Sequence, residues 1–218
     1  FYYVHGIAQI DSNQPPIFCV PSGNFGNLTA GLMAQKIGIP IAGFIAATNA
    51  NDVVPDYLNT GKFKPRSSQR TISNAMDVGN PSNFARIRHL FNGDLQKIKQ
   101  QLWGASFSDV QTQDAIGEVY QKYHHLMDPH TAVGYQAAKQ YQNSASGYFG
   151  EDTRSPIIIL STAHPAKFGD VIEPVIGEQV SIPDRLASCL DKSKQSIKMK
   201  NEYENLRQWL LRSYESKS

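Results

Sequence analysis

Residues 17–48 constrain the fold of this 218-residue chain more than any other segment. Ile17–Pro21 is a short apolar run ended by proline, which is typical of a buried strand. Polar residues and glycines follow at 22–27, the apolar spacing over 28–37 predicts a helix, and 41–48 is a second apolar run. A strand, loop, helix and strand in this order form a βαβ unit. We therefore expect two parallel, neighbouring strands.

The rest of the chain continues to alternate helical and apolar segments. Asp128, Pro129 and His130 predict a helix start, with Asp as the N-cap and Pro in the first position. The β-branched run at 157–160 predicts a third buried strand, in a parallel sheet covered on both faces. The other expected elements are a polar stretch over 49–82, two helices over 83–101 broken at Asn92 and Gly93, a short strand over 105–110, a helix over 112–124, and mostly helix after 168. We predict an α/β fold with an open, mostly parallel sheet flanked by helices.

Charge and cysteine content exclude several classes of protein. The formal net charge is only +2 and charges of both signs are interspersed, unlike the basic patch of a nucleic-acid-binding protein. The basic cluster at 192–200 has acidic neighbours and is interpreted as a solvated helix face. No apolar run has the length of a membrane span. Cys19 and Cys189 have no pairing motif, which favours free thiols in a reducing cytoplasm.

The loop at 22–27 has the composition of a phosphate-binding loop. Gly23 and Gly26 accept positive φ and leave room for a ligand close to the backbone. The helix that follows adds unpaired N–H groups and the positive end of its dipole, and Asn24 and Asn27 add side-chain amides. A glycine turn that only lets strand and helix pack closely remains an alternative. Neither the dinucleotide fingerprint nor the P-loop is present.

Four sequence motifs occur along the chain. The last of them is a second loop that follows a predicted strand, the one at 157–160. The four motifs are VPSGNFGNLTAG at 20–31, FIAATN at 44–49, SNAMD at 73–77 and STAHPAKF at 161–168. Together, and in this order, they resemble the threonine synthase family of the longer type found in many bacteria and in fungi. The resemblance implies the fold type II architecture of pyridoxal-phosphate (PLP) enzymes, which is similar to the tryptophan synthase β subunit. It also implies conversion of O-phosphohomoserine and water to threonine and phosphate.

The resemblance assigns roles to individual residues. Those that match the family's loop for the cofactor phosphate are Gly23, Asn24, Phe25, Gly26 and Asn27. Thr162 matches the residue whose hydroxyl hydrogen-bonds the pyridine nitrogen. A neutral hydroxyl, unlike a carboxylate, does not require that nitrogen to be protonated.

Several other polar residues have two interpretations. His164 and Lys167 either contact a phosphorylated substrate or only pack and bond nearby backbone. Ser73 and Asn74 either serve the substrate or cap a turn. For Asp128 and His130, helix capping is favoured over a catalytic role. The adjacent pair His124 and His125 does not share a helix face, and no residue set has zinc-like spacing, so no metal is expected.

The start of the chain carries a further expectation. Phe1 already lies in a helical apolar pattern without a cap, and the family's Schiff-base lysine precedes the glycine loop, whereas no lysine precedes Ser22 here. We expect residues 1–218 to be the C-terminal, PLP-phosphate-binding portion of a threonine synthase, inactive alone and partnered by the lysine-bearing N-terminal part. Two alternatives stay open. They are a non-catalytic phosphate-binding or assembly module, and part of a PLP-dependent, dehydratase-like lyase.

Overall fold

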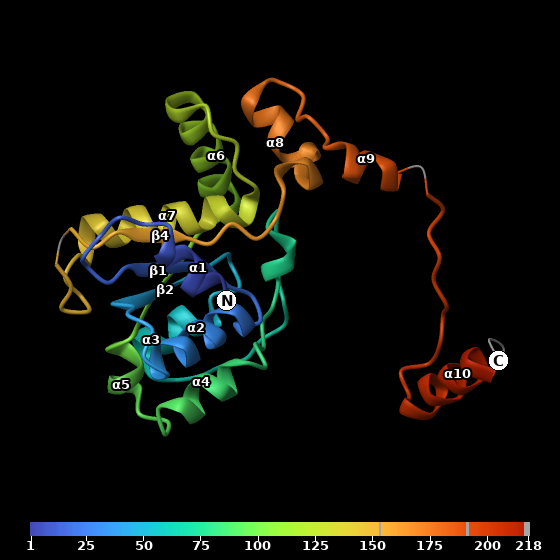
Figure 1. The fold of residues 1–218 in the computed structure, drawn as a ribbon, viewed down its shortest axis with the longest axis horizontal. Coiled ribbons are helices and arrows are strands. Elements are labelled where there is room, and N and C mark those ends of the chain that lie inside the picture. The colour runs from blue at the N-terminus through green and yellow to red at the C-terminus, as the bar shows by residue number, and fades with distance from the viewer. Residues whose placement is uncertain (153, 191, 216–218) are drawn as a thin grey trace. The chain divides into compact units, whose positions relative to one another are not determined.

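A computed structural model describes residues 1–152, 154–190 and 192–215. The chain divides into two compact units, Phe1–Ser181 and Ile182–Ser218. The elements of the first unit are α1 (Tyr2–Ala8), β1 (Ile17–Pro21), α2 (Gly26–Lys36), β2 (Gly43–Thr48), α3 (Val53–Thr60), η1 (Asn74–Met76), α4 (Phe84–Leu90), α5 (Leu95–Lys99), β3 (Leu102–Ser106), α6 (Asp109–Tyr123), α7 (Pro129–Ser144), β4 (Ile157–Ile159), η2 (Pro165–Phe168) and α8 (Gly169–Ile176). Figure 1 shows their arrangement.

The first unit is built on a parallel sheet with the strand order β3-β2-β1-β4. All three strand pairs are parallel, with Phe18 opposite Phe44 and Ile158, and Phe44 opposite Leu102. This confirms the predicted βαβ unit, in which β1 and β2 are neighbours. The carboxyl ends of β1 and β4, where the two predicted ligand loops begin, therefore lie side by side.

Alternate residues of the strands enter two different cores, as the period of two in a strand requires. Phe18 and Phe44 pack with α2, α3 and α4 on one face, whereas Cys19 and Ile45 pack against α7 on the other. Figure 1 shows these helices on opposite sides of the sheet. A third cluster joins α6, α7 and α8 around Ile116. The predicted sheet flanked by helices is thus confirmed.

The helix boundaries follow local signals closely. Asp128 caps α7, accepting hydrogen bonds from the backbone N–H groups of His130 and Thr131, as predicted. The predicted break between α4 and α5 is also confirmed, because Asn92 and Gly93 both have positive φ, 53° and 71°.

Three predictions for the first unit need correction. The stretch 49–82 contains a helix, α3, which begins two residues before Pro55, where the missing N–H of proline costs no hydrogen bond. The strand expected at 105–110 is β3, Leu102–Ser106, since Ser108 and Gln111 form a capping box that starts α6. The residues of β4 are only half-buried, because β4 is the outermost strand of the described sheet and pairs with β1 on one side.

The second unit contains α9 (Asp184–Leu190) and α10 (Tyr203–Glu215). The basic cluster at 192–200 lies in irregular chain between these helices, so its interpretation as a helix face is wrong. Neither this unit nor the first contains, among the described residues, a helix long and apolar enough to cross a membrane.

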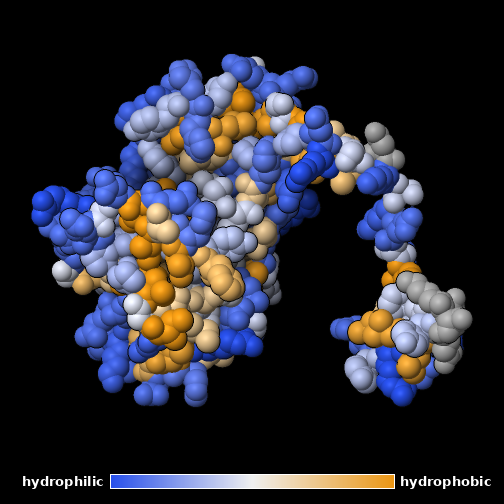
Figure 2. Space-filling model, viewed as in Figure 1, coloured by the Kyte–Doolittle hydropathy of each residue, from blue (hydrophilic) through white to orange (hydrophobic). Residues whose placement is uncertain are grey.

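Exposed apolar side chains gather on one face of the first unit. Figure 2 shows them where α1 and α2 lie in Figure 1. On α1, α2 and the residues that flank them, these are Phe1, Tyr2, Val4, Met33 and Ile37. Large exposed apolar faces are typical of contact surfaces for other protein segments.

Candidate functional site

The glycine loop presents a row of free backbone donors. Ser22 closes β1 by donating its N–H to the carbonyl of Ala47, at 2.8 Å. From Gly23 through Leu28, no backbone N–H donates a hydrogen bond to any residue that the structure describes. Several unpaired N–H groups that include the first turn of a helix form an anion-binding arrangement.

The residue with left-handed backbone in this loop is Phe25, not a glycine. Its φ is 61°, and it lies directly before α2. Neither Gly23 nor Gly26 has positive φ, so the expectation that these glycines supply left-handed backbone is wrong. The ring of Phe25 is buried and packs edge-to-face on Phe84, 6.3 Å between centroids. This packing holds a backbone conformation that costs a non-glycine residue about 1–2 kcal/mol.

Gly23 is required by a close approach instead. A Cβ at this position would lie 2.6 Å from Met76 Cα and 2.8 Å from the carbonyl oxygen of Ala75. The backbone of η1 therefore packs directly on the glycine loop. At Gly26 an added Cβ would meet only the side chain of Asn83, at 3.3 Å.

The asparagines of the loop are both anchored. Asn24 Oδ1 accepts hydrogen bonds from the backbone N–H and the hydroxyl of Ser82, at 2.7 and 3.0 Å. Tyr3 lies with its hydroxyl 2.7 Å from the carbonyl oxygen of Asn27 and 3.0 Å from its Oδ1. Burial raises the pKa of Tyr3, which keeps this hydroxyl a donor. Sequence reasoning missed Tyr3, since only its place in an apolar helix was visible.

The two predicted cofactor loops meet at one pocket. A cavity of about 320 Å³ is lined by Tyr2, His5, Gly6, Asn27, Leu160, Ser161 and Thr162. Leu160 extends the pairing of β4 by donating its N–H to the carbonyl of Cys19, at 3.0 Å. This bond places Thr162 beside the end of β1, where the glycine loop starts. Asn27 and Thr162, predicted from separate motifs, thus face the same space.

Two of the four substrate candidates line one cavity, and the other two are hydrogen-bonded to neighbouring residues. Asn74 and Lys167 line a second cavity of about 390 Å³ together with Arg70. Ser73 is fully buried, and its hydroxyl accepts from the amide of Asn49, at 3.1 Å. His164 caps η2, because its Nδ1 accepts from the N–H of Ala166, at 3.2 Å.

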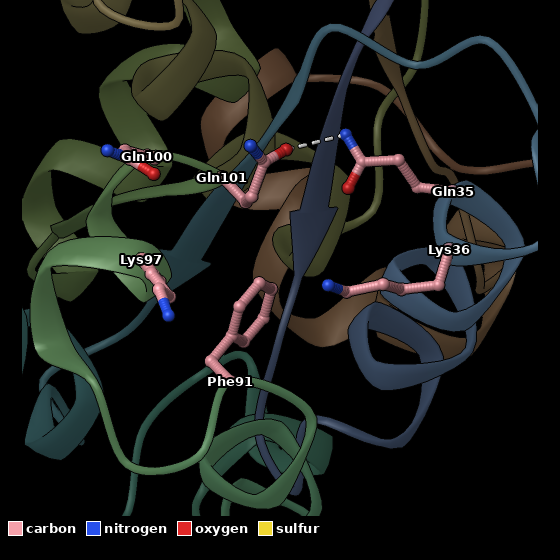
Figure 3. A pocket seen from close by; sticks show the side chains of 6 residues that line it. All are labelled: Gln35, Lys36, Phe91, Lys97, Gln100 and Gln101. Atoms are coloured by element: carbon pink, nitrogen blue, oxygen red, sulfur yellow. Dashed lines mark hydrogen bonds between the residues drawn. The ribbon is translucent and has the colours of Figure 1, made fainter.

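Another cavity, of about 450 Å³, lies at the opposite end of α2 from the glycine loop. It is lined by Gln35, Lys36, Phe91, Lys97, Gln100 and Gln101. Figure 3 shows Gln35 bonded to Gln101, at 2.7 Å, and the Lys36 ammonium above the ring of Phe91, 4.9 Å from its centroid. No predicted site residue lines this cavity. Among the described residues no group of three or more His, Cys, Asp and Glu side chains is placed to hold a metal.

Comparisons with known proteins agree with one another. Residues 131–210 match the family model "Threonine synthase, C-terminal". The threonine synthase of Haemophilus influenzae is 40% identical, over 97% of this chain and 48% of its own length. The crystal structure of threonine synthase from Escherichia coli aligns with a TM-score of 0.80 and 35% identity, over 97% of this chain and 47% of that one.

A PLP-bound threonine synthase from Brucella melitensis aligns with a TM-score of 0.77 and 26% identity, over 96% of this chain and 48% of that one. The chain spans about half the length of the curated relatives that it matches. These alignments confirm the fold type II architecture.

Proposed function

We propose that this chain, a homologue of threonine synthases over nearly all its length, is the PLP-phosphate-binding portion of such an enzyme. The whole enzyme would convert O-phosphohomoserine and water to threonine and phosphate. The observation that carries the proposal is the shared pocket of Asn27 and Thr162, beside the free N–H groups of the glycine loop. We assign this binding role to residues 1–218 as one portion of the enzyme. We also place the protein in the cytoplasm, because its two cysteines are free.

The residues present fit PLP. The free N–H groups from Gly23 to Asn27 would bind its phosphate, and each hydrogen bond to a charged group contributes about 1.5–3 kcal/mol. Thr162 would offer its neutral hydroxyl to the pyridine nitrogen. When bound, PLP would supply an electron sink for carbanion chemistry on the substrate. The side chains around the pocket would orient the ring and exclude water from one side of it.

The substrate phosphate would bind in the cavity of Asn74 and Lys167. Both side chains are donors there, and Arg70 adds a planar guanidinium suited to a phosphate. Ser73 and His164 would act through the backbone that they hold, since each is already bonded to a neighbour.

The lysine that joins the cofactor would come from another part of the enzyme. Among the residues that the structure describes, no lysine lines the pocket of Asn27 and Thr162. The exposed apolar face of α1 and α2 would pack against that part. A dehydratase-like lyase is disfavoured, because the family model, the Haemophilus influenzae relative and the Escherichia coli structure all carry the threonine synthase name.

The binding proposal is tested by titrating PLP into the protein that carries this sequence. Asn27→Asp keeps the shape of the side chain but adds a negative charge facing the pocket, and we expect affinity to fall more than tenfold by charge repulsion. Thr162→Val should weaken binding and Thr162→Ser should restore it. Asn143→Asp, an exposed position on α7, is the matched control. Equal affinity of Asn27→Asp and Asn143→Asp would refute the assignment.

The activity proposal needs a second assay. Chain 1–218 with PLP and O-phosphohomoserine should release no phosphate until a lysine-bearing threonine synthase portion is added. Full turnover by the chain alone would refute the proposed source of the lysine. If chain 1–218 binds PLP but releases no phosphate even after the lysine-bearing portion is added, the non-catalytic module is favoured instead.

A further inference from the structure

Asp128 makes more hydrogen bonds than a helix cap needs. A cap requires only bonds from the first backbone N–H groups of the helix. Here Oδ1 accepts from the N–H of His130, at 2.9 Å, and also from the ring Nδ1 of His130, at 2.8 Å. Oδ2 accepts from the hydroxyl of Thr131. The carboxylate is almost fully buried, so each of these bonds is shielded from water.

One arm of this cluster reaches the glycine loop. Because Nδ1–H of His130 donates to Asp128, its Nε2 is the acceptor, and it receives the N–H of Ala75, at 3.3 Å. Ala75 and Met76 are the residues whose backbone packs on Gly23. The ring also meets Phe168, 5.1 Å between centroids, so it is held from two sides.

The other arm reaches the second loop. The hydroxyl hydrogen of Thr131 goes to Asp128, which leaves its oxygen to accept from the hydroxyl of Ser161, at 3.0 Å. Ser161 lines the pocket and directly precedes Thr162. Thr131 therefore connects Asp128 to the residue proposed to face the pyridine nitrogen.

We infer that Asp128, through His130 and Thr131, is a positioning centre that fixes the glycine loop and the Thr162 loop relative to each other. This inference rests on the proposed function, since it names what aligns the two sides of the PLP pocket. None of the three residues lines that pocket, so they act through Ala75 and Ser161. A buried network with every partner satisfied is rigid, which suits a site that must hold a ring at both ends.

The first test is amide hydrogen exchange in the protein without ligand. Asp128→Ser keeps an N-cap oxygen but is too short to hold both side chains, so helix α7 stays capped while both arms are released. We expect exchange to rise about tenfold at Ala75 and at Leu160, whose N–H groups are bonded in the structure. Asp94→Ser, the same change at the cap of α5, is the matched control and should alter neither loop.

Two single-arm variants separate the connections. Thr131→Val should speed exchange at Leu160 alone, and Thr131→Ser should restore it. His130→Phe keeps a ring against Phe168 but loses the acceptor, so exchange should rise at Ala75 alone. Thr112→Val removes a buried hydroxyl that bonds the carbonyl of Ser108, the N-cap residue of α6, and serves as the control for Thr131→Val.

PLP affinity supplies the second readout. It should fall several-fold in Asp128→Ser and stay unchanged in Asp94→Ser. Exchange in Asp128→Ser within twofold of the unmodified protein at both loops would overturn the inference, as would equal effects of Thr131→Val and Thr112→Val. If the unmodified protein binds no PLP, the proposed function fails, whereas the exchange experiment still decides the role of Asp128.

Discussion

Replacing Gly23 by alanine tests the contact on which the glycine loop depends. The added Cβ would lie 2.6 Å from Met76 Cα and 2.8 Å from the carbonyl oxygen of Ala75. Both are backbone atoms, so η1 or the loop itself must move. Forcing an extra methyl into a packed site costs about 1–3 kcal/mol. For a chain of this size, that loss lowers the melting temperature by about 2–12 °C.

Gly26→Ala is the matched control. It adds the same methyl two residues after Asn24, at the first position of α2, and meets only the flexible amide of Asn83, at 3.3 Å. Alanine replacing glycine in a helix gains up to about 1 kcal/mol. We therefore expect Gly26→Ala to match or exceed the stability of the unmodified protein.

The assay is urea unfolding followed by circular dichroism, with PLP titration of the same samples. Gly23→Ala should lower both the free energy of unfolding and PLP affinity, because a movement of the loop would displace its free N–H groups. Equal stability of Gly23→Ala and Gly26→Ala would show that η1 does not pack on this loop, and the steric argument would be refuted.

Two further predictions concern residues that hold the site. Tyr3→Phe removes the hydroxyl that anchors Asn27 and should lower the free energy of unfolding by about 1 kcal/mol, whereas exposed Tyr2→Phe should not; equal values would contradict the anchor. Burial raises the pKa of Asp128, but bonds from His130 and Thr131 outweigh it and leave that pKa below its usual value. Its stabilisation is therefore complete above the unfolded pKa of about 3.9 and is lost as pH falls through the lower folded value. The stability gap between the unmodified protein and Asp128→Asn should thus shrink between pH 7 and pH 3 in urea titrations, and a constant gap would contradict this.

Local sequence patterns predicted much of the scaffold. The bounds of β1, the break at Asn92 and Gly93 and the cap at Asp128 all depend on residues within one or two turns of each other. Such signals arise from backbone propensity and side-chain bonds to neighbouring N–H groups, which the sequence lists in order. The four ordered motifs also predicted that the loops at 22–27 and 161–168 bind the cofactor.

Other features depend on residues that are distant in the chain. The half-burial of β4 depends on its place in the strand order, which no local pattern contains. Gly23 is needed because η1, some fifty residues later, packs on it, and its own φ is negative.

The connections within the site have the same origin. Sequence alone identified the glycine loop, Thr162 and the cap at Asp128 as separate features. Only the tertiary structure joined them, through the bonds of Tyr3 to Asn27, His130 to Ala75 and Thr131 to Ser161. Periodicity and caps are short-range properties of the chain, whereas which loops share a pocket is decided by how the sheet and helices pack.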